Sequence, residues 1–246
     1  MKLRGLLTIA CGLALTAGSL CLHILAAEAP GNKQDATALA SASIAKMEVG
    51  KTDWPQWGGW SGRNNTPPGS NIPAKWDVSS GENIKWVTPL GSNILGSPVV
   101  ANGKIYVGTN NTAGLVKRFP SNKDLGCLVC LDEKTGKFLW QHSSEKLALG
   151  ASHDFGLQGI CCSPCVDGNR LWFVTSRGEV ACLDTEGFTN GNDGPDKSEE
   201  NENKDEADVI WKFDMMAELK TLQFYMCSCS VTCATLWIRS PITTPV

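Results

Sequence analysis

The feature that most constrains the fold of this chain is an internal repeat with a period of about 54 residues. Trp86 and Trp140 are 54 residues apart, whereas Trp140 and Trp211 are 71 apart. The longer interval contains an acidic run of 16 residues, 193–208, and the first unit carries an extra stretch at 111–123. Once both insertions are set aside, the two units have nearly the same length, about 54 residues. Such repeats are typical of β-propeller blades or β-solenoids, because one unit cannot bury its apolar face alone.

Each unit contains about four short runs of β-branched and aromatic residues, separated by Gly, Asn and Asp. This pattern predicts an all-β fold of four-stranded antiparallel blades. In the turn after the third run, Asp132 can accept hydrogen bonds from backbone amides and Gly136 can adopt a positive φ. We expect large aromatic rings to pack between neighbouring blades and to supply much of the stability; these are Trp86, Trp140, Trp172 and Trp211.

The turn and the strand after it resemble the tryptophan-docking motif A-x-D-x-x-T-G-x-x-x-W of the pyrroloquinoline quinone (PQQ) repeat propellers. Residues 130–140 match every fixed position except the first, where Cys130 replaces Ala. A second copy at 182–187 is partial, and its Trp follows only after the acidic run. The start of the region, 53–57, is also similar to the first strand of exported propellers of this superfamily. The residues assigned to the repeat motif are Asp132, Thr135, Gly136, Trp140, Cys182, Asp184, Gly187 and Trp211.

The resemblance covers about residues 53–230 and implies a fold more firmly than an activity. Enzymes of the family bind PQQ and calcium at the propeller axis, and some carry a disulfide between adjacent cysteines over the quinone. Cys161 and Cys162 are such a pair and are the cofactor-binding candidates, with ordinary strand residues as the other interpretation. Because the family's catalytic Asp and calcium ligands are not found by motif, we assign no catalytic residue, no metal site and no cofactor.

Eleven cysteines are present, of which Cys11 and Cys21 lie in the N-terminal apolar segment. The other nine allow core packing, disulfides or a zinc site built from two C-x-x-C pairs. Cys130 and Cys182 lie in C-L-D triplets within apolar runs. That position favours core packing, since free Cys is a common small core residue.

The N-terminus has the layout of an export signal: Lys2 and Arg4 precede an uncharged stretch that runs to Ala27. Residues 1–27 are interpreted as a cleaved signal peptide or an uncleaved membrane-anchor helix. Residues 28–52 are interpreted as a flexible spacer. Either N-terminal alternative predicts an exported protein, periplasmic or anchored facing the exoplasmic side.

The acidic insertion 193–208 holds eight carboxylates and two lysines. We expect a solvated loop that projects from a blade, because clustered like charges repel and stay hydrated; weak calcium binding is the alternative. His153 and Asp154 are unconvincing as a catalytic pair, because neighbours on a strand point to opposite faces. His142 is likewise given no role.

The repeat region is predicted to span residues 53–234, with about three blades, the last of them incomplete, and an irregular tail at 235–246. The pattern suggests a truncated propeller. The net charge of -3 argues against nucleic-acid binding. We therefore predict a binding or scaffolding module for a protein or small ligand at the blade surface, which contacts a membrane only through its N-terminal segment. A PQQ- and calcium-dependent alcohol or sugar dehydrogenase, or a remnant of one, is the alternative.

Overall fold

The computed structural model describes residues 49–60, 65–67, 69–147, 155–197, 199 and 202–220, together with the single positions 38, 42 and 46. Several expectations lie outside these residues. They are the signal or anchor at 1–27, most of the spacer, the His153–Asp154 pair, the third blade beyond Lys220 and the tail at 235–246.

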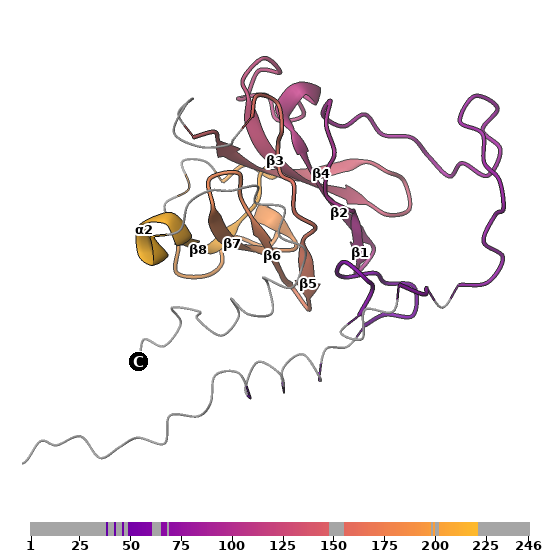
Figure 1. Cartoon of the computed structure of the whole chain (residues 1–246), viewed down its shortest axis with the longest axis horizontal. Coiled ribbons are helices and arrows are strands. Elements are labelled where there is room, and N and C mark those ends of the chain that lie inside the picture. Colours follow the sequence, from indigo (N-terminus) through magenta and orange to yellow (C-terminus); the bar gives the residue numbers. More distant parts are fainter. Residues whose placement is uncertain are drawn as a thin grey trace, which may run out of the picture. The chain divides into compact units, whose positions relative to one another are not determined.

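The described chain forms two four-stranded antiparallel sheets, each with its strands in sequence order (Figure 1). The first sheet consists of β1 (Val99–Ala101), β2 (Lys104–Asn110), β3 (Leu125–Asp132) and β4 (Phe138–Glu145). The second consists of β5 (Cys165–Asp167), β6 (Arg170–Val174), β7 (Glu179–Asp184) and β8 (Val209–Asp214). The helical segments are short: η1 (Asn111–Ala113), η2 (Gly187–Thr189) and α2 (Met215–Leu219). The prediction of an all-β fold with four-stranded antiparallel sheets is confirmed.

The two sheets repeat one another in register as well as in strand order. Cys130 on β3 pairs with Trp140 on β4, and Cys182 on β7 pairs with Trp211 on β8. A register shift follows each cysteine at the same place, between Cys130 and Leu131 and between Cys182 and Leu183. The extra residue is on the fourth strand each time, Leu139 on β4 and Ile210 on β8. Because an extra residue bends the strand that carries it, the fourth strands of both sheets bend at equivalent positions.

The sheets approach each other through their first strands. The Ser97 amide donates to Ser163 Oγ at 2.9 Å, and Asn102 Nδ2 donates to the Gly168 carbonyl at 2.9 Å. Both bonds join residues 66 positions apart, which is the separation of corresponding residues in β1 and β5. Equivalent positions of consecutive units therefore lie next to each other, an arrangement consistent with two blades of a partial propeller.

The main core lies between the sheets. One face of the first sheet presents Tyr106, Leu128 and Trp140 to it, and the second sheet contributes Leu171 and Phe173. All five side chains are at most 1% exposed. The opposite face of the first sheet has its own smaller core, covered in part by Trp86, Leu90 and Phe119. The first sheet is thus apolar on both faces, as a sheet stacked between two layers must be.

Residues 83–86, which form the first β-type run of the first repeat unit, are not part of any sheet. Trp86 and Leu90 are half-buried against the first sheet, whereas Val87 and Pro89 between them are exposed. This alternation is that of a strand with one face packed. The segment is not assigned as a strand because, within the described residues, no neighbouring strand pairs with its backbone.

Candidate functional site

The junction between the two sheets is built around the indole of Trp140. Its Nε1 donates to the carbonyl of Thr185 at 3.2 Å, in the turn that follows β7. Gly187 in that turn has φ of 55°, and a Cβ there would lie 2.9 Å from Trp140 Cδ1. Glycine therefore serves twice: it adopts the left-handed conformation and it lets the ring approach the backbone.

Trp86 docks on the first sheet in the same manner. Its Nε1 donates to the Glu133 carbonyl at 3.0 Å, and a Cβ on Gly136, at φ of 70°, would lie 2.4 Å from the ring. Asp132 holds this turn by accepting hydrogen bonds from the amide and hydroxyl of Thr135 at 2.8 and 2.6 Å. These two bonds hold the pKa of Asp132 below its ordinary value.

The degenerate second motif builds a related turn by other contacts. Asp184 is fully buried and accepts a hydrogen bond from the Glu186 amide at 2.7 Å. Its second oxygen forms an ion pair with Arg170 across the hairpin. Trp211, the last residue of this motif, is 8% exposed within the same core as Trp140.

The first strands of both sheets are bridged by the segment that precedes them. Trp54 and Val100 exchange two backbone hydrogen bonds of 2.7 and 2.9 Å, and the Pro55 carbonyl accepts the Val166 amide at 2.8 Å. Gln56, 5% exposed, lies next to Cys165. Residues 54–56 therefore contact the first strand of each sheet, β1 through Trp54 and β5 through Pro55 and Gln56.

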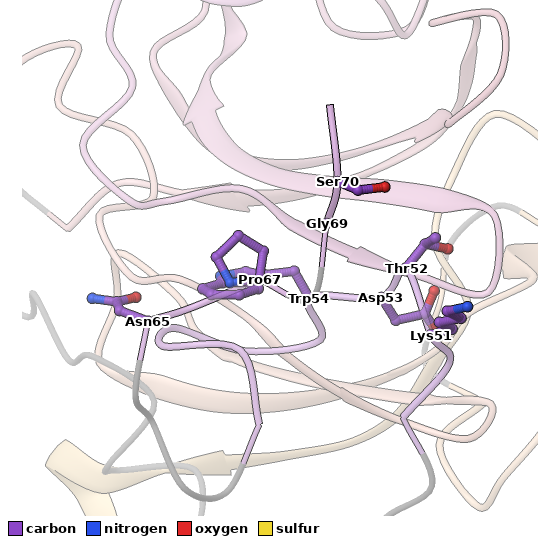
Figure 2. A pocket seen from close by; sticks show the side chains of 8 residues that line it. All are labelled: Lys51, Thr52, Asp53, Trp54, Asn65, Pro67, Gly69 and Ser70. Carbon is purple, nitrogen blue, oxygen red and sulfur yellow. The ribbon is translucent and has the colours of Figure 1, made fainter. Parts of the chain in front are cut away.

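A pocket of about 620 Å³ lies beside this segment and is shown in Figure 2. Lys51, Asp53, Trp54 and Pro67 are among the residues that line it (Figure 2). A Cβ on Gly59 would be 3.0 Å from the same ring. The Trp54 indole is therefore half-buried, with Gly59 against it, and forms part of the pocket wall.

The cofactor candidates Cys161 and Cys162 lie just before β5. Cys162 is 2% exposed, and its Sγ lies 3.2 Å from both the amide and the carbonyl of Val174 on β6. Cys161 is half-buried, with its Sγ 3.1 Å from Gln158 Nε2. The Cys162 thiol is thus packed against β6, whereas Cys161 contacts Gln158 in the segment before β5. Because Cys162 is 2% exposed, it does not present its thiol for stacking on a quinone.

The thiols of Cys127, Cys130 and Cys182 are free and fully buried. Burial raises the pKa of all three, to about 12 for Cys127 and Cys182. Such thiols act as small apolar core groups rather than nucleophiles.

The described part of the chain contains no cluster of three His, Cys, Asp or Glu residues able to hold a metal. None of its helices is long and apolar enough to span a bilayer.

The two insertions that interrupt the repeat meet each other. Arg118 of the first donates from Nε and Nη2 to both carboxylate oxygens of Glu206 of the second, at 2.5–2.8 Å. Beside this pair, the amide of Gln141 on β4 donates to the Asp205 carbonyl and the Ala207 amide donates back to Gln141, at 3.0 and 3.1 Å. The acidic insertion therefore forms one isolated parallel β-bridge, through Glu206, with Gln141 on the last strand of the first sheet.

The expectation of a loop that projects into solvent is wrong for the end of this insertion. Glu206, Ala207 and Asp208 are at most 6% exposed. Charge repulsion does not expel them, because Arg118 neutralises Glu206 and the Asp193 amide donates to Asp208 Oδ2 at 2.7 Å. Burial, aided by the neighbouring carboxylates, raises the pKa of Asp208 to about 6.

A polar cavity of about 300 Å³ lies where the two insertions meet β4 and β8. His142 on β4 forms part of its wall, is 6% exposed and packs edge-on against Phe173 with ring centroids 5.1 Å apart. Burial, and then the charge of Lys212, lowers the pKa of His142 to about 3. The sequence did not predict this cavity, because Arg118 and Glu206 are 88 positions apart. The one signal in the sequence was that each residue lies in an insertion that interrupts the repeat.

The shifted pKa of His142 predicts a loss of stability in acid. Its folded-state pKa of about 3 lies below the ordinary 6.5, so the folded state disfavours the imidazolium. Above pH 6.5 the imidazole is neutral in both the folded and the unfolded state, so it does not lower the free energy of unfolding. As the pH falls from 6.5 toward 3, the unfolded state takes up a proton that the folded state does not, and the free energy of unfolding decreases. In urea unfolding between pH 7.5 and 4.5, His142→Leu should lose less stability than the wild type. If both proteins lost the same stability between pH 7.5 and 4.5, burial of His142 would not be the cause of the acid sensitivity.

The fold and its junctions define a class: repeated four-stranded antiparallel sheets joined by docked indoles. A comparison of the sequence with protein families found no match, and a comparison with curated proteins found none. Among solved structures, the chain is similar to a europium-containing methanol dehydrogenase, with a TM-score of 0.41 and 13% identity over 70% of this chain and 25% of that one. It is also similar to the quinohemoprotein alcohol dehydrogenase of Comamonas testosteroni, with a TM-score of 0.27 and 15% identity over 73% and 31%. The chain thus spans a quarter to a third of these dehydrogenases.

Proposed function

We propose that this chain is an exported PQQ-like β-propeller repeat protein that acts as a binding or scaffolding module for a protein partner. The positively charged start and the apolar stretch to Ala27 support export. The two sheets, with indoles docked on glycine turns, support a PQQ-like repeat. The residues that could bind a partner lie before the first sheet.

The observation that carries the binding role is a run of exposed apolar side chains in the segment 69–95. This segment connects the region of Trp54 to β1 (Figure 1, purple). Single exposed apolar residues are common on soluble proteins, but several on one segment mark an interaction surface. Six large apolar residues are 45–69% exposed there: Ile72, Trp76, Val78, Val87, Ile94 and Leu95.

Partner binding should depend on this segment. A double variant, Trp76→Ser with Val87→Ser, replaces two side chains that are 68% and 69% exposed and is expected to fold normally. Used as bait in an envelope extract, the wild type should retain one defined protein at stable stoichiometry, and the double variant should lose it.

Leu219→Ser is the matched control, since Leu219 on α2 is 40% exposed and lies outside the segment. The control should retain the partner. Loss of the partner in the control, or its retention by the double variant, would refute the role of the segment.

A PQQ titration separates this proposal from the dehydrogenase alternative. Purified full-length protein is titrated with PQQ and Ca²⁺ and assayed for dye-linked alcohol oxidation. We expect neither saturable PQQ binding nor oxidation, because Cys162, one of the two cofactor candidates, is 2% exposed. Saturable binding accompanied by oxidation would replace the binding-module proposal.

A further inference from the structure

The cavity between the two insertions has a wall of six charged residues, of which four neutralise one another. Arg118 pairs with Glu206 at 2.5 Å, and Lys123 pairs with Glu145 at 3.2 Å. The other two are Glu199, in the acidic insertion, and Lys212, on β8. Neither forms an ion pair with any described residue. The wall therefore carries one uncommitted negative and one uncommitted positive charge.

Two groups in this wall have polar atoms without a hydrogen-bond partner. His142 is 94% buried, and the described structure gives its Nδ1 no partner. Glu199 accepts the Val209 amide with one oxygen at 2.9 Å, while its other oxygen, Oε2, is buried and unsatisfied. A buried carboxylate oxygen without a donor is costly, so its presence beside a cavity points to a ligand that supplies N–H groups.

From this arrangement we propose that the cavity binds the zwitterionic group of a free amino acid. The ligand's ammonium donates to Glu199 Oε2 and to the imidazole of His142. Its carboxylate pairs with the ammonium of Lys212. The site is separate from the segment 69–95, so it does not depend on the proposed partner binding.

The dimensions and the remaining lining suit a ligand of this class. A volume of about 300 Å³ is at the small end of ligand pockets, large enough for an amino acid with its side chain and too small for an oligomer. Phe119, Ala207 and Val209 form an apolar part of the wall. The guanidinium of Arg118 lies 4.1 Å from the Phe119 ring centroid, which fixes the ring in place.

Isothermal titration calorimetry on the full-length protein tests the proposal with glycine, leucine, glutamate and lysine as probes. At least one should bind saturably. Butylamine and butyrate, which carry one charge each, should bind at least ten-fold more weakly. Glu199→Gln and Lys212→Met should each weaken amino-acid binding at least ten-fold, because each removes one of the two uncommitted charges.

Glu202→Gln and Lys204→Met are matched controls. They make the same charge changes at exposed positions of the same insertion, outside the cavity wall, and should leave affinity unchanged. The proposal is overturned if no amino acid binds the wild type, which would leave water to satisfy His142 and Glu199. It is also overturned if butylamine or butyrate binds as tightly, or if the controls weaken binding as much as Glu199→Gln and Lys212→Met.

Discussion

Replacing Trp140 with Ala should lower the free energy of unfolding by about 3–5 kcal/mol, the range for removing a fully buried large aromatic. The ring is 1% exposed, packs 5.8 Å from Tyr106 between centroids, and donates its N–H to the Thr185 carbonyl. Its removal opens a cavity between the sheets and leaves that carbonyl without its donor. Urea unfolding followed by far-UV circular dichroism measures the loss.

Trp76→Ala is the matched control, because that ring is 68% exposed and lies outside both cores. We expect a change within about 0.5 kcal/mol for this variant. Gly187→Ala should reproduce part of the Trp140 effect, since a Cβ there would lie 2.9 Å from the ring and 3.0 Å from the Glu206 carbonyl. Equal losses for Trp140→Ala and Trp76→Ala would mean that the docked indole does not hold the sheets together.

Replacing Arg118 with Ala should destabilise the protein by about 2–3 kcal/mol, because a nearly buried carboxylate would lose its counter-charge. The Glu206 side chain is 8% exposed. It accepts hydrogen bonds from Arg118 and, at 3.1 Å, from Asn203 Nδ2, and in the variant the bond from Asn203 would remain while those from Arg118 would be lost. The expected loss is below that of a fully buried pair, since the Arg118 side chain is 35% exposed and partly screened by solvent. Chemical denaturation at pH 7.5 measures it.

Lys123→Ala provides the comparison from the same cavity wall. It removes a pair with Glu145 whose side chains are 44% and 71% exposed, so the expected loss is at most about 0.5 kcal/mol. Adding Glu206→Gln to Arg118→Ala should recover part of the stability, because no charge is then left buried. Strict additivity of the two substitutions would show that Arg118 and Glu206 do not stabilise each other.

The strands could be predicted because their cause is local. In residues 127–132 and 179–184, apolar and β-branched residues are bounded by Asp and Gly turns, and both runs form strands. The packing of Trp86 and Trp140 was also foreseeable, because both rings recur with the period of the repeat. Each lies opposite a glycine that leaves room for it, Gly136 for Trp86 and Gly187 for Trp140. The segment 84–90 shows the limit: it has the alternation of a strand, yet pairing needs a neighbour that its own residues cannot specify.

The meeting of the two insertions was not predictable, because charge composition describes a segment and not its partner. Residues 193–208, taken alone, are an acidic run that should stay hydrated. Folding brings Arg118 to within hydrogen-bond distance of Glu206 and thereby removes the reason for exposure. The same contact creates the cavity in which His142, Glu199 and Lys212 meet.

The order of residues by itself determined the repeating unit, its strands and its glycine turns, because these follow from side-chain alternation and backbone conformation over a few positions. Only the tertiary structure decided which charges are neutralised, which histidine has a buried ring nitrogen without a hydrogen-bond partner, and which strands the segment 54–56 contacts. Electrostatic and hydrogen-bond energies depend on distance and burial in space, and residues 88 positions apart acquire both only when the sheets have packed.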